Sequence, residues 1–419
     1  MIARPREDVC EDCWKYANSF RFRKRGVGSK GTSAGDDDDD DDDREQEHNE
    51  GVVESAKVHV EQAKIQRKLF NDKQEEAKVS RWLPRSQRTV TWVLDFAQNM
   101  SLPQFGKEQP GQTYYLCPLN IYVFGIVDTC NDSLQAYVYG EDIAGKGGNC
   151  VASMFMHHVN KHLLPTDSDD DKAPIKELNL VMDNCGGQNK NRHVLRLLTV
   201  LVKRKIVDRF NAIFLVKGHT KNPCDRMFNL LKKDTRKDNI YTPDMLFQAL
   251  NRQEGVTASL FDGFHDWDDW ENKYLRKNIP SIKSFHLFTV PAEDGGEDYM
   301  ERSTHYGAEK SIIPMVNAAN REDSTWLSTE PNAIARVGLA DIKHVELYDK
   351  WRPLVPEPYW KDFIYFREEP DSAKRQRVSK EKQASKRQRK DRQRTDQEAT
   401  ALQPADSTQP KATGTSPTH

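Results

Sequence analysis

The segment LNLVMDNCGGQNKNRHVLRLLTVL, residues 178–201, constrains the fold more than any other stretch of the chain. A short apolar run ends at Asp183, a polar segment with two glycines follows, and a longer apolar segment then begins. A short apolar run bounded by turn residues is typical of a buried strand, and a longer one that ends in Lys and Arg is typical of a helix. The pattern therefore predicts a strand-to-helix connection with a lone carboxylate at the end of the strand.

The segment from 88 to about 250 carries further elements of the same kind. Three strands are expected first, in RTVTWVLDFA, TYYLCPLNIYVFGIVD and LQAYVYGED, and a helix in NCVASMFMHHVNKHLL follows them. LNLVMD and FNAIFLVKG are the fourth and fifth strands, and each is followed by a helix. Three consecutive strands favour antiparallel pairs, whereas a strand–helix–strand unit requires a parallel pair with a right-handed crossover. We therefore predict an α/β fold with a mixed five-stranded sheet flanked by helices.

Shifts in composition divide the 419-residue chain into six segments. They are an N-terminal segment (1–30), a disordered acidic linker (31–52), a connecting helix (53–84), the α/β core (85–285), a small α+β extension (286–370) and a disordered tail that is first basic and then rich in Ser, Thr and Pro (371–419). The linker holds a run of aspartates, which cannot build an apolar core. The formal net charge of −2 therefore hides an acidic and a basic block that nearly cancel.

Several classes of protein are disfavoured by the sequence. We find no run of about 18 apolar residues, so no membrane span is expected. The start, MIARPREDVC, lacks the apolar region of a secretory signal, and the seven cysteines follow no regular framework. Both observations favour a reducing intracellular compartment. Glycine-rich phosphate-binding loops are also missing from the sequence, so nucleotide-driven chemistry is not indicated.

Three aspartates occupy corresponding places in the predicted topology. Asp95 ends the first strand, Asp183 ends the fourth, and Asp225 lies in the first turn of the helix after the fifth. The first and fourth strands are plausible neighbours, so these carboxylates are expected to gather at one edge of the sheet. Crowded carboxylates repel one another unless a cation neutralises them, and Mg²⁺ and Mn²⁺ prefer such oxygen ligands. The alternative is that each aspartate only caps backbone amides at a strand end or helix start.

The motifs LDFAQNMSLPQF, MDNCGGQNKNRHV and VKGHTKNPCDRMFNLLK give the chain a specific resemblance. They resemble a family of uncharacterised, transposon-derived proteins with the patterns D-x-A-Q-N-x-x-L-P, D-N-C-x-G-Q-N-K-N and G-H-T-x-x-x-C-D. The resemblance covers about 85–285. The order of elements is similar to the ribonuclease-H-like core of DDE/DDD transposases and integrases. The resemblance implies a ribonuclease-H-like fold and a metal-dependent transposase or nuclease.

The resemblance also implies roles for individual residues. Asp95, Asp183 and Asp225 would be the catalytic, metal-binding triad for two Mg²⁺ or Mn²⁺ ions, although the third acid of most transposases is Glu. A supporting set would lie near the triad: Asn184, Gln188, Asn189, Lys190, Lys217 and His219. His219 is equally well read as a structural histidine.

The two ends of the chain carry other features. Cys10 and Cys13 form a C-x-x-C pair, which fits either part of a zinc site or two free thiols. His48 and His59 are the nearest histidines. The basic clusters of the tail fit a nuclear import signal or a nucleic-acid tether, and the alternative is a solvated charge run.

The leading functional hypothesis is a nuclear, transposase-like enzyme that cleaves or joins DNA phosphodiester bonds with two divalent metals. Water or a DNA 3′-hydroxyl would be the nucleophile. A non-enzymatic, domesticated DNA-binding or scaffold protein with the same fold is the first alternative, and a ribonuclease acting on RNA–DNA hybrids is the second. A homo-oligomer is compatible with each of them.

Overall fold

A computed structural model describes most of the chain. The described residues are 10, 13–14, 39–165, 172–216, 218, 222–291, 298–362, 376–380, 382–384 and 386. The chain divides into two compact units, one formed by Met1–Gln112 and Pro118–Gly338 and the other by Thr113–Cys117 and Leu339–His419. The first unit holds the whole β-sheet and all three aspartates of the predicted site.

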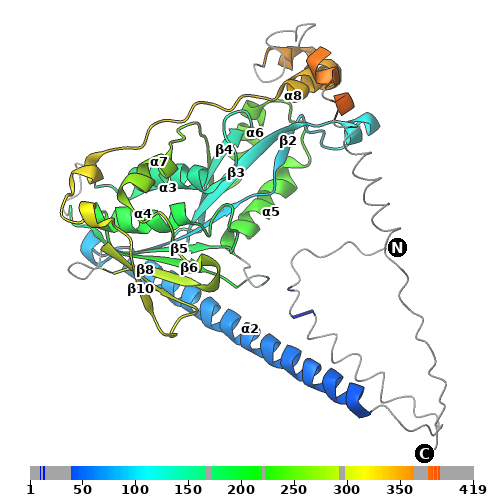
Figure 1. Ribbon diagram of the computed structural model, residues 1–419. Coiled ribbons are helices and arrows are strands. Elements are labelled where there is room, and N and C mark those ends of the chain that lie inside the picture. The colour runs from blue at the N-terminus through cyan, green and yellow to red at the C-terminus, as the bar shows by residue number, and fades with distance from the viewer. Residues whose placement is uncertain are drawn as a thin grey trace, which may run out of the picture. The chain divides into compact units, whose positions relative to one another are not determined.

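A mixed sheet of ten strands runs through the first unit, in the order β10-β9-β8-β6-β5-β1-β3-β4-β7, with β2 paired to β3 (Figure 1). The strands are β1 (Thr89–Phe96), β2 (Met100–Leu102), β3 (Leu119–Asp128), β4 (Ser133–Gly140), β5 (Ile175–Met182), β6 (Val207–Phe214), β7 (Val256–Leu260), β8 (Leu287–Val290), β9 (Tyr299–Ser303) and β10 (Ser311–Pro314). The pairs β1–β5, β5–β6 and β4–β7 are parallel, and the other pairs are antiparallel. The predicted mixed α/β sheet is therefore confirmed.

The predicted number of strands is wrong, because only the five central strands, β1 and β3 to β6, were anticipated. The strands at the two margins, β7 to β10, have only four or five residues each. Such short segments give too little periodicity to be distinguished from loops. Three of them, β8 to β10, lie in the segment 286–370 that was expected to be a separate extension. They instead continue the core sheet, since β8 pairs with β6.

Helices cover both faces of the sheet. α3 (Gly148–His162), α4 (Arg192–Lys203) and α7 (Trp267–Tyr274) contact one another on one face, and α2 (Asp39–Ser80) and α5 (Pro223–Thr235) contact β1 on the other (Figure 1). α6 (Pro243–Leu250) packs against α5 and β7. Because helices cover both faces of the sheet, successive side chains of β1 contact helices on opposite faces. Trp92 and Leu94 lie in the core with α3 and α4, whereas the Thr91 hydroxyl donates to the Lys73 carbonyl of α2 over 2.8 Å.

The helix α2 covers most of the segment 53–84, where a connecting helix was expected, but it begins earlier, at Asp39. It therefore extends into the segment 31–52, for which disorder was predicted. The described part of the chain has no helix that is long and apolar enough to cross a membrane.

The second unit is built from short helical segments. α8 (Asp341–Glu346) leads into a π-helical turn, Leu347–Trp351, and two 3-10 turns follow, Arg352–Leu354 and Glu357–Lys361. The buried Trp351 indole donates to the Cys117 carbonyl over 3.2 Å and ties the two chain segments together. The predicted tail, 371–419, lies outside the described residues except for 376–380, 382–384 and 386, which are helical.

Candidate metal-binding carboxylate site

The three predicted aspartates come together at one edge of the sheet. β1 and β5 are parallel neighbours with Leu94 opposite Met182, as the sequence predicted. Asp95 is the next residue of β1, and Asp183 directly follows β5. Asp225 lies in the first turn of α5, which packs against β1. Each carboxylate is close enough to the other two for its charge to affect them.

Asn222 connects Asp95 to Asp225. Its side-chain amide donates to Asp95 Oδ2 over 3.1 Å, and its side-chain carbonyl accepts from the Asp225 amide over 2.8 Å. The Asn222 amide donates in turn to Asp225 Oδ2 over 3.4 Å, which completes a capping box. Asp225 thus has the structural capping role that was the alternative to metal binding, and it still faces the cluster. The sequence analysis missed Asn222, although Asn-Pro-x-Asp at a helix start is a recognisable capping signal.

The loop after β5 fixes the position of Asp183. Asn189, which is fully buried, donates from its side chain to Asp183 Oδ1 over 2.7 Å, and the Cys185 amide donates to the same oxygen over 3.1 Å. Gln188 takes part through its backbone, since its carbonyl accepts from the Asn191 side chain over 2.7 Å. Among the predicted supporting residues that the structure describes, Asn189 is the one whose side chain bonds to the Asp183 carboxylate.

Asn184 and Lys190 brace the same loop against its surroundings. The Lys190 ammonium donates to Asn184 Oδ1 over 2.7 Å and to the Lys283 carbonyl over 3.2 Å. The Asn184 side chain donates to the Leu215 carbonyl, just beyond β6. These bonds join the chain after β5 to the chain after β6. The remaining two predicted supporting residues, Lys217 and His219, lie outside the described residues.

Burial and mutual repulsion make ionisation of this cluster unfavourable. Burial raises the pKa of Asp95 to about 7, and the neighbouring Asp183 charge contributes further to the increase. The pKa of Asp225 is also raised, mainly by burial. Protons or a cation would relieve this cost. A cluster that resists ionisation without a counter-charge is therefore chemically suited to bind divalent cations.

Lys146 places positive charge beside Asp95, and Lys190 lies in the loop that follows Asp183. The Lys146 ammonium is near enough to Asp95 to interact with its charge, and it donates to Asn99 Oδ1 over 2.9 Å. Burial lowers the pKa of Lys146, and it lowers that of Lys190 to about 8. Lys146 was missed because its turn, GKGGN, precedes α3 and is brought to β1 only by the tertiary fold.

The carboxylate oxygens are not all in mutual contact. Within the part of the chain that the structure describes, the one set of three His, Cys, Asp or Glu ligands with all ligand atoms within 4.8 Å of one another is Cys10, Cys13 and His59. The aspartates therefore do not surround a single point. A site for two ions does not require this, because different pairs of carboxylates can hold the two ions.

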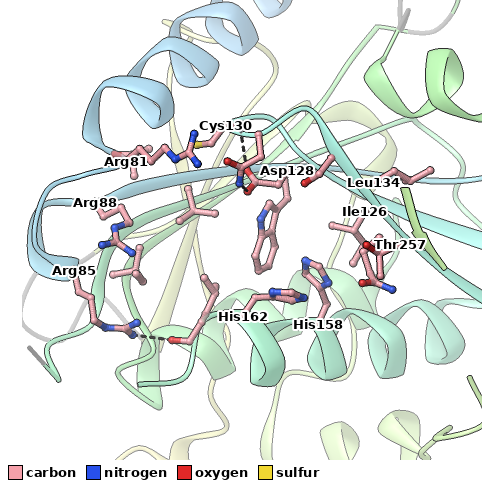
Figure 2. A pocket seen from close by; sticks show the side chains of 18 of the residues that line it. Arg81, Arg85, Arg88, Ile126, Asp128, Cys130, Leu134, His158, His162 and Thr257 are labelled. Atoms are coloured by element: carbon pink, nitrogen blue, oxygen red, sulfur yellow. Dashed lines mark hydrogen bonds between the residues drawn. The ribbon is translucent and has the colours of Figure 1, made fainter. Parts of the chain in front are cut away.

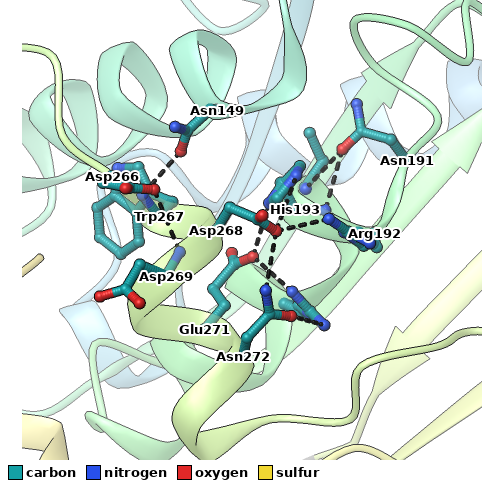
Figure 3. A network of polar contacts seen from close by, with 12 residues as sticks. Asn149, Asn191, Arg192, His193, Asp266, Trp267, Asp268, Asp269, Glu271 and Asn272 are labelled. Atoms are coloured by element: carbon teal, nitrogen blue, oxygen red, sulfur yellow. Dashed lines mark hydrogen bonds and ion pairs between the residues drawn. The ribbon is translucent and has the colours of Figure 1, made fainter. Parts of the chain in front are cut away.

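A buried polar network connects the start of α4 to α7 (Figure 3). Asn191 caps α4, and His193 Nδ1 lies 2.8 Å from Glu271 Oε2 of α7. Arg196 bonds to the same oxygen over 3.1 Å, and both the arginine and the glutamate are fully buried. The network anchors the helix whose preceding loop carries Asp183 and Asn189.

The loop after Asp183 does not require glycine at Gly186 or Gly187. Neither residue has a positive φ, the backbone conformation that favours glycine. A Cβ atom at Gly187 would meet no atom within 4 Å, and one at Gly186 would only touch the Lys190 carbonyl at 3.9 Å. The turn is held instead by hydrogen bonds to the Cys185 carbonyl, including one of 2.8 Å from the Asn189 amide.

We therefore predict that Gly186→Ala and Gly187→Ala are tolerated. Each should change the free energy of unfolding by less than about 0.5 kcal/mol, as surface substitutions usually do. Urea denaturation of the two variants and the wild type provides the measurement. A loss of more than about 1 kcal/mol would show that the loop depends on glycine after all.

The raised pKa of Asp95 predicts how stability depends on pH. The folded protein retains a proton on Asp95 up to about pH 7, whereas an ordinary aspartate has a pKa of 3.8. The stability that the folded protein gains from this retained proton is complete below pH 3.8 and is lost as the pH rises through about 7. The stability of the wild type relative to Asp95→Asn should therefore fall between about pH 4 and pH 7. Urea denaturation in EDTA measures it, and a constant difference across that range would contradict the assignment.

A cavity of about 570 Å³ lies at the other end of β1, where Thr89 and Val90 line it (Figure 2). Three arginines contribute to its wall, Arg81, Arg85 and Arg88. His158 also lines it, with Nδ1 2.9 Å from the Tyr137 hydroxyl, and burial lowers the pKa of His158 to about 2. None of the three carboxylates lines this cavity. This cavity is therefore separate from the candidate site.

The comparisons with known proteins give one match. Residues 113–306 match a family described as "Domain of unknown function (DUF7869)". The matched region contains Asp183 and Asp225, while Asp95 precedes it. No curated protein and no solved structure gives a significant match.

Proposed function

We propose that the protein is a metal-dependent polynucleotidyl transferase or nuclease of the transposase and integrase type. The observation that carries the proposal is the meeting of Asp95, Asp183 and Asp225 at one sheet edge, with the pKa of Asp95 raised to about 7. The central strands support it, because β4-β3-β1-β5-β6 follow the order 3-2-1-4-5 of the five predicted strands. The first and fourth predicted strands are therefore parallel neighbours, so the strand ends that carry Asp95 and Asp183 lie side by side.

Asp95 and Asp183 would hold one Mg²⁺ or Mn²⁺, and Asp95 with Asp225 a second. When bound, two such ions stabilise the attacking and leaving oxygens of a phosphodiester. The protein's own residues would orient the carboxylates. Asn189 fixes Asp183 through a 2.7 Å bond, and Asn222 fixes Asp95 through a 3.1 Å bond. Partners of this kind typically contribute 10–100-fold to metal affinity or activity in metalloproteins.

The charge around the site suits a polyanionic substrate. Lys146 lies beside Asp95, and Lys190 lies in the loop that follows Asp183. Burial lowers the pKa of both lysines, so a neighbouring phosphate would stabilise their charged forms. DNA is the substrate that the proposal favours. The Lys- and Arg-rich segment 373–394 of the tail would add non-specific affinity for the phosphate backbone and direct the protein to the nucleus.

The proposal is tested with the purified full chain and end-labelled DNA. We expect strand cleavage or strand joining in Mg²⁺ or Mn²⁺, and none in EDTA. An RNA–DNA hybrid in parallel reactions distinguishes the ribonuclease alternative. DNA binding without any product under all metal conditions would overturn the enzymatic proposal and favour the domesticated, non-enzymatic form.

A further inference from the structure

Cys10, Cys13 and His59 form a cluster of ligands that is separate from the carboxylate site. Their three ligand atoms all lie within 4.8 Å of one another, and Cys10 Sγ is 3.0 Å from His59 Nε2. The cysteines and the histidine come from segments far apart in the sequence. Their meeting therefore depends on the tertiary fold.

Local structure directs each ligand toward the cluster. The Trp14 amide donates to the Cys10 carbonyl over 2.9 Å, which closes a helical turn over the C-x-x-C pair. Residues three apart on such a turn lie on the same side. His59 is on the face of α2 that carries the buried Ala56 and Ala63. It is thus presented from a helix that is packed on the sheet.

We propose that this cluster binds Zn²⁺. Zinc sites in proteins combine Cys and His at about 2.3 Å and 2.0 Å, so neighbouring ligand atoms of a tetrahedral site lie roughly 3.5–3.8 Å apart. The 3.0 Å between Cys10 Sγ and His59 Nε2 is a hydrogen-bond distance, so these two atoms would move apart by about 0.5 Å to hold the ion. Three protein ligands leave one tetrahedral position for a water molecule or a further side chain. On binding, the two thiols would lose their protons to solvent, and the neutral imidazole would donate a ring lone pair. Sulfur ligands select zinc over Mg²⁺, which keeps this site chemically distinct from the carboxylates.

The zinc site would clamp the N-terminal segment onto the turn between β6 and α5. Gly218 in this turn has a φ of +77°, and a Cβ atom there would lie 2.6 Å from Cys10 Cβ and 2.8 Å from Cys10 Cα. The Cys10 backbone therefore sits directly against Gly218. The turn precedes α5, which begins with Asn222 as its cap and carries Asp225. The metal would hold Cys10 against the turn that leads into α5 and therefore to Asp225.

The direct test is the zinc content of the full-length protein, expressed with added zinc and measured by elemental mass spectrometry. We expect one zinc per chain in the wild type and in Cys117→Ser, a control at an exposed cysteine of the second unit. Cys10→Ser and Cys13→Ser should lose it. A wild type free of zinc, or zinc retained in both variants, would overturn the proposal and leave a thiol–imidazole hydrogen bond.

Cobalt substitution is a second test, because it reports thiolate ligation by absorption and not by zinc content. Co²⁺ at this site should give a near-ultraviolet thiolate charge-transfer band in the wild type, and Cys10→Ser and Cys13→Ser should lose most of it. His59→Gln should keep the band while lowering the affinity. Absence of the band in the wild type would contradict thiolate ligation.

Gly218→Ala tests the clamp itself, because it keeps all three ligands. The added Cβ would collide with Cys10, so zinc affinity should fall by about 10–100-fold, the usual range for loss of a supporting contact. Unchanged affinity would mean that the site does not rest on this turn. None of these measurements uses DNA cleavage, so their failure would leave the carboxylate proposal untouched.

Discussion

Asp183→Asn should abolish metal-dependent DNA cleavage, while Asn189→Ala should only reduce it. Asp183 is proposed as a direct metal ligand, and Asn189 acts on it through a 2.7 Å hydrogen bond. Loss of such an orienting partner typically costs 10–100-fold, and loss of the ligand itself should cost more. Rates of cleavage of labelled DNA over a range of Mn²⁺ concentrations provide the measurement.

The metal dependence separates the two roles. Excess Mn²⁺ should restore much of the activity of Asn189→Ala, because its carboxylate ligand is still present. Asp183→Asn should not recover at any concentration. Thermal melts should first establish that both variants fold. If Asp183→Asn cleaved as fast as the wild type, Asp183 would be only a residue at a strand end.

Arg196→Met should destabilise the fold strongly. Arg196 bonds to Glu271, to Asn272 and to the carbonyls of Arg276 and Lys277 at 2.8–3.1 Å, and its side chain is fully buried. Its removal would leave the buried Glu271 carboxylate with much of its charge uncompensated. Breaking a buried pair in this way typically costs about 3–5 kcal/mol. Urea denaturation measures the loss.

Arg192→Met is the matched control. Arg192 is only four residues away on the same helix and pairs with Asp268 over 2.6 Å, but 38% of its side chain is exposed. Exposed pairs of this kind contribute about 0–1 kcal/mol. Equal losses in the two variants would mean that the network in Figure 3 does not carry the stability assigned to it.

The central part of the fold could be predicted because its strands are buried on both faces. β1 and β5 read as short apolar runs, each ending at an aspartate, and the parallel pairing of β5 with β6 follows from the helix α4 that connects them. The margins of the sheet could not be predicted. β9, with the sequence YMERS, is short and half polar, and only its pairing with β8 and β10 makes it a strand.

The candidate site also has one part that could be predicted from the sequence and another that could not. Its carboxylates occur at ends of predictable elements, so the sequence located Asp95, Asp183 and Asp225. Asn222 is recognisable locally as a helix cap, but its bond to Asp95 and the proximity of Lys146 to Asp95 join segments distant in sequence, which no local pattern reveals. His59 was noted in the sequence only as one of two nearby histidines. The fold of α2 against the sheet brings it to the cysteines.

The central claim is that the three carboxylates bind divalent cations, and crystals soaked in Mn²⁺ test it most directly. We predict anomalous scattering peaks for Mn²⁺ between Asp95 and Asp183 and beside Asp225, with oxygen ligands at about 2.0–2.6 Å, the range of Mg²⁺ and Ca²⁺ sites. Crystals of Asp183→Asn should lose the first peak. A wild-type map with no manganese near these residues at saturating Mn²⁺ would contradict the account.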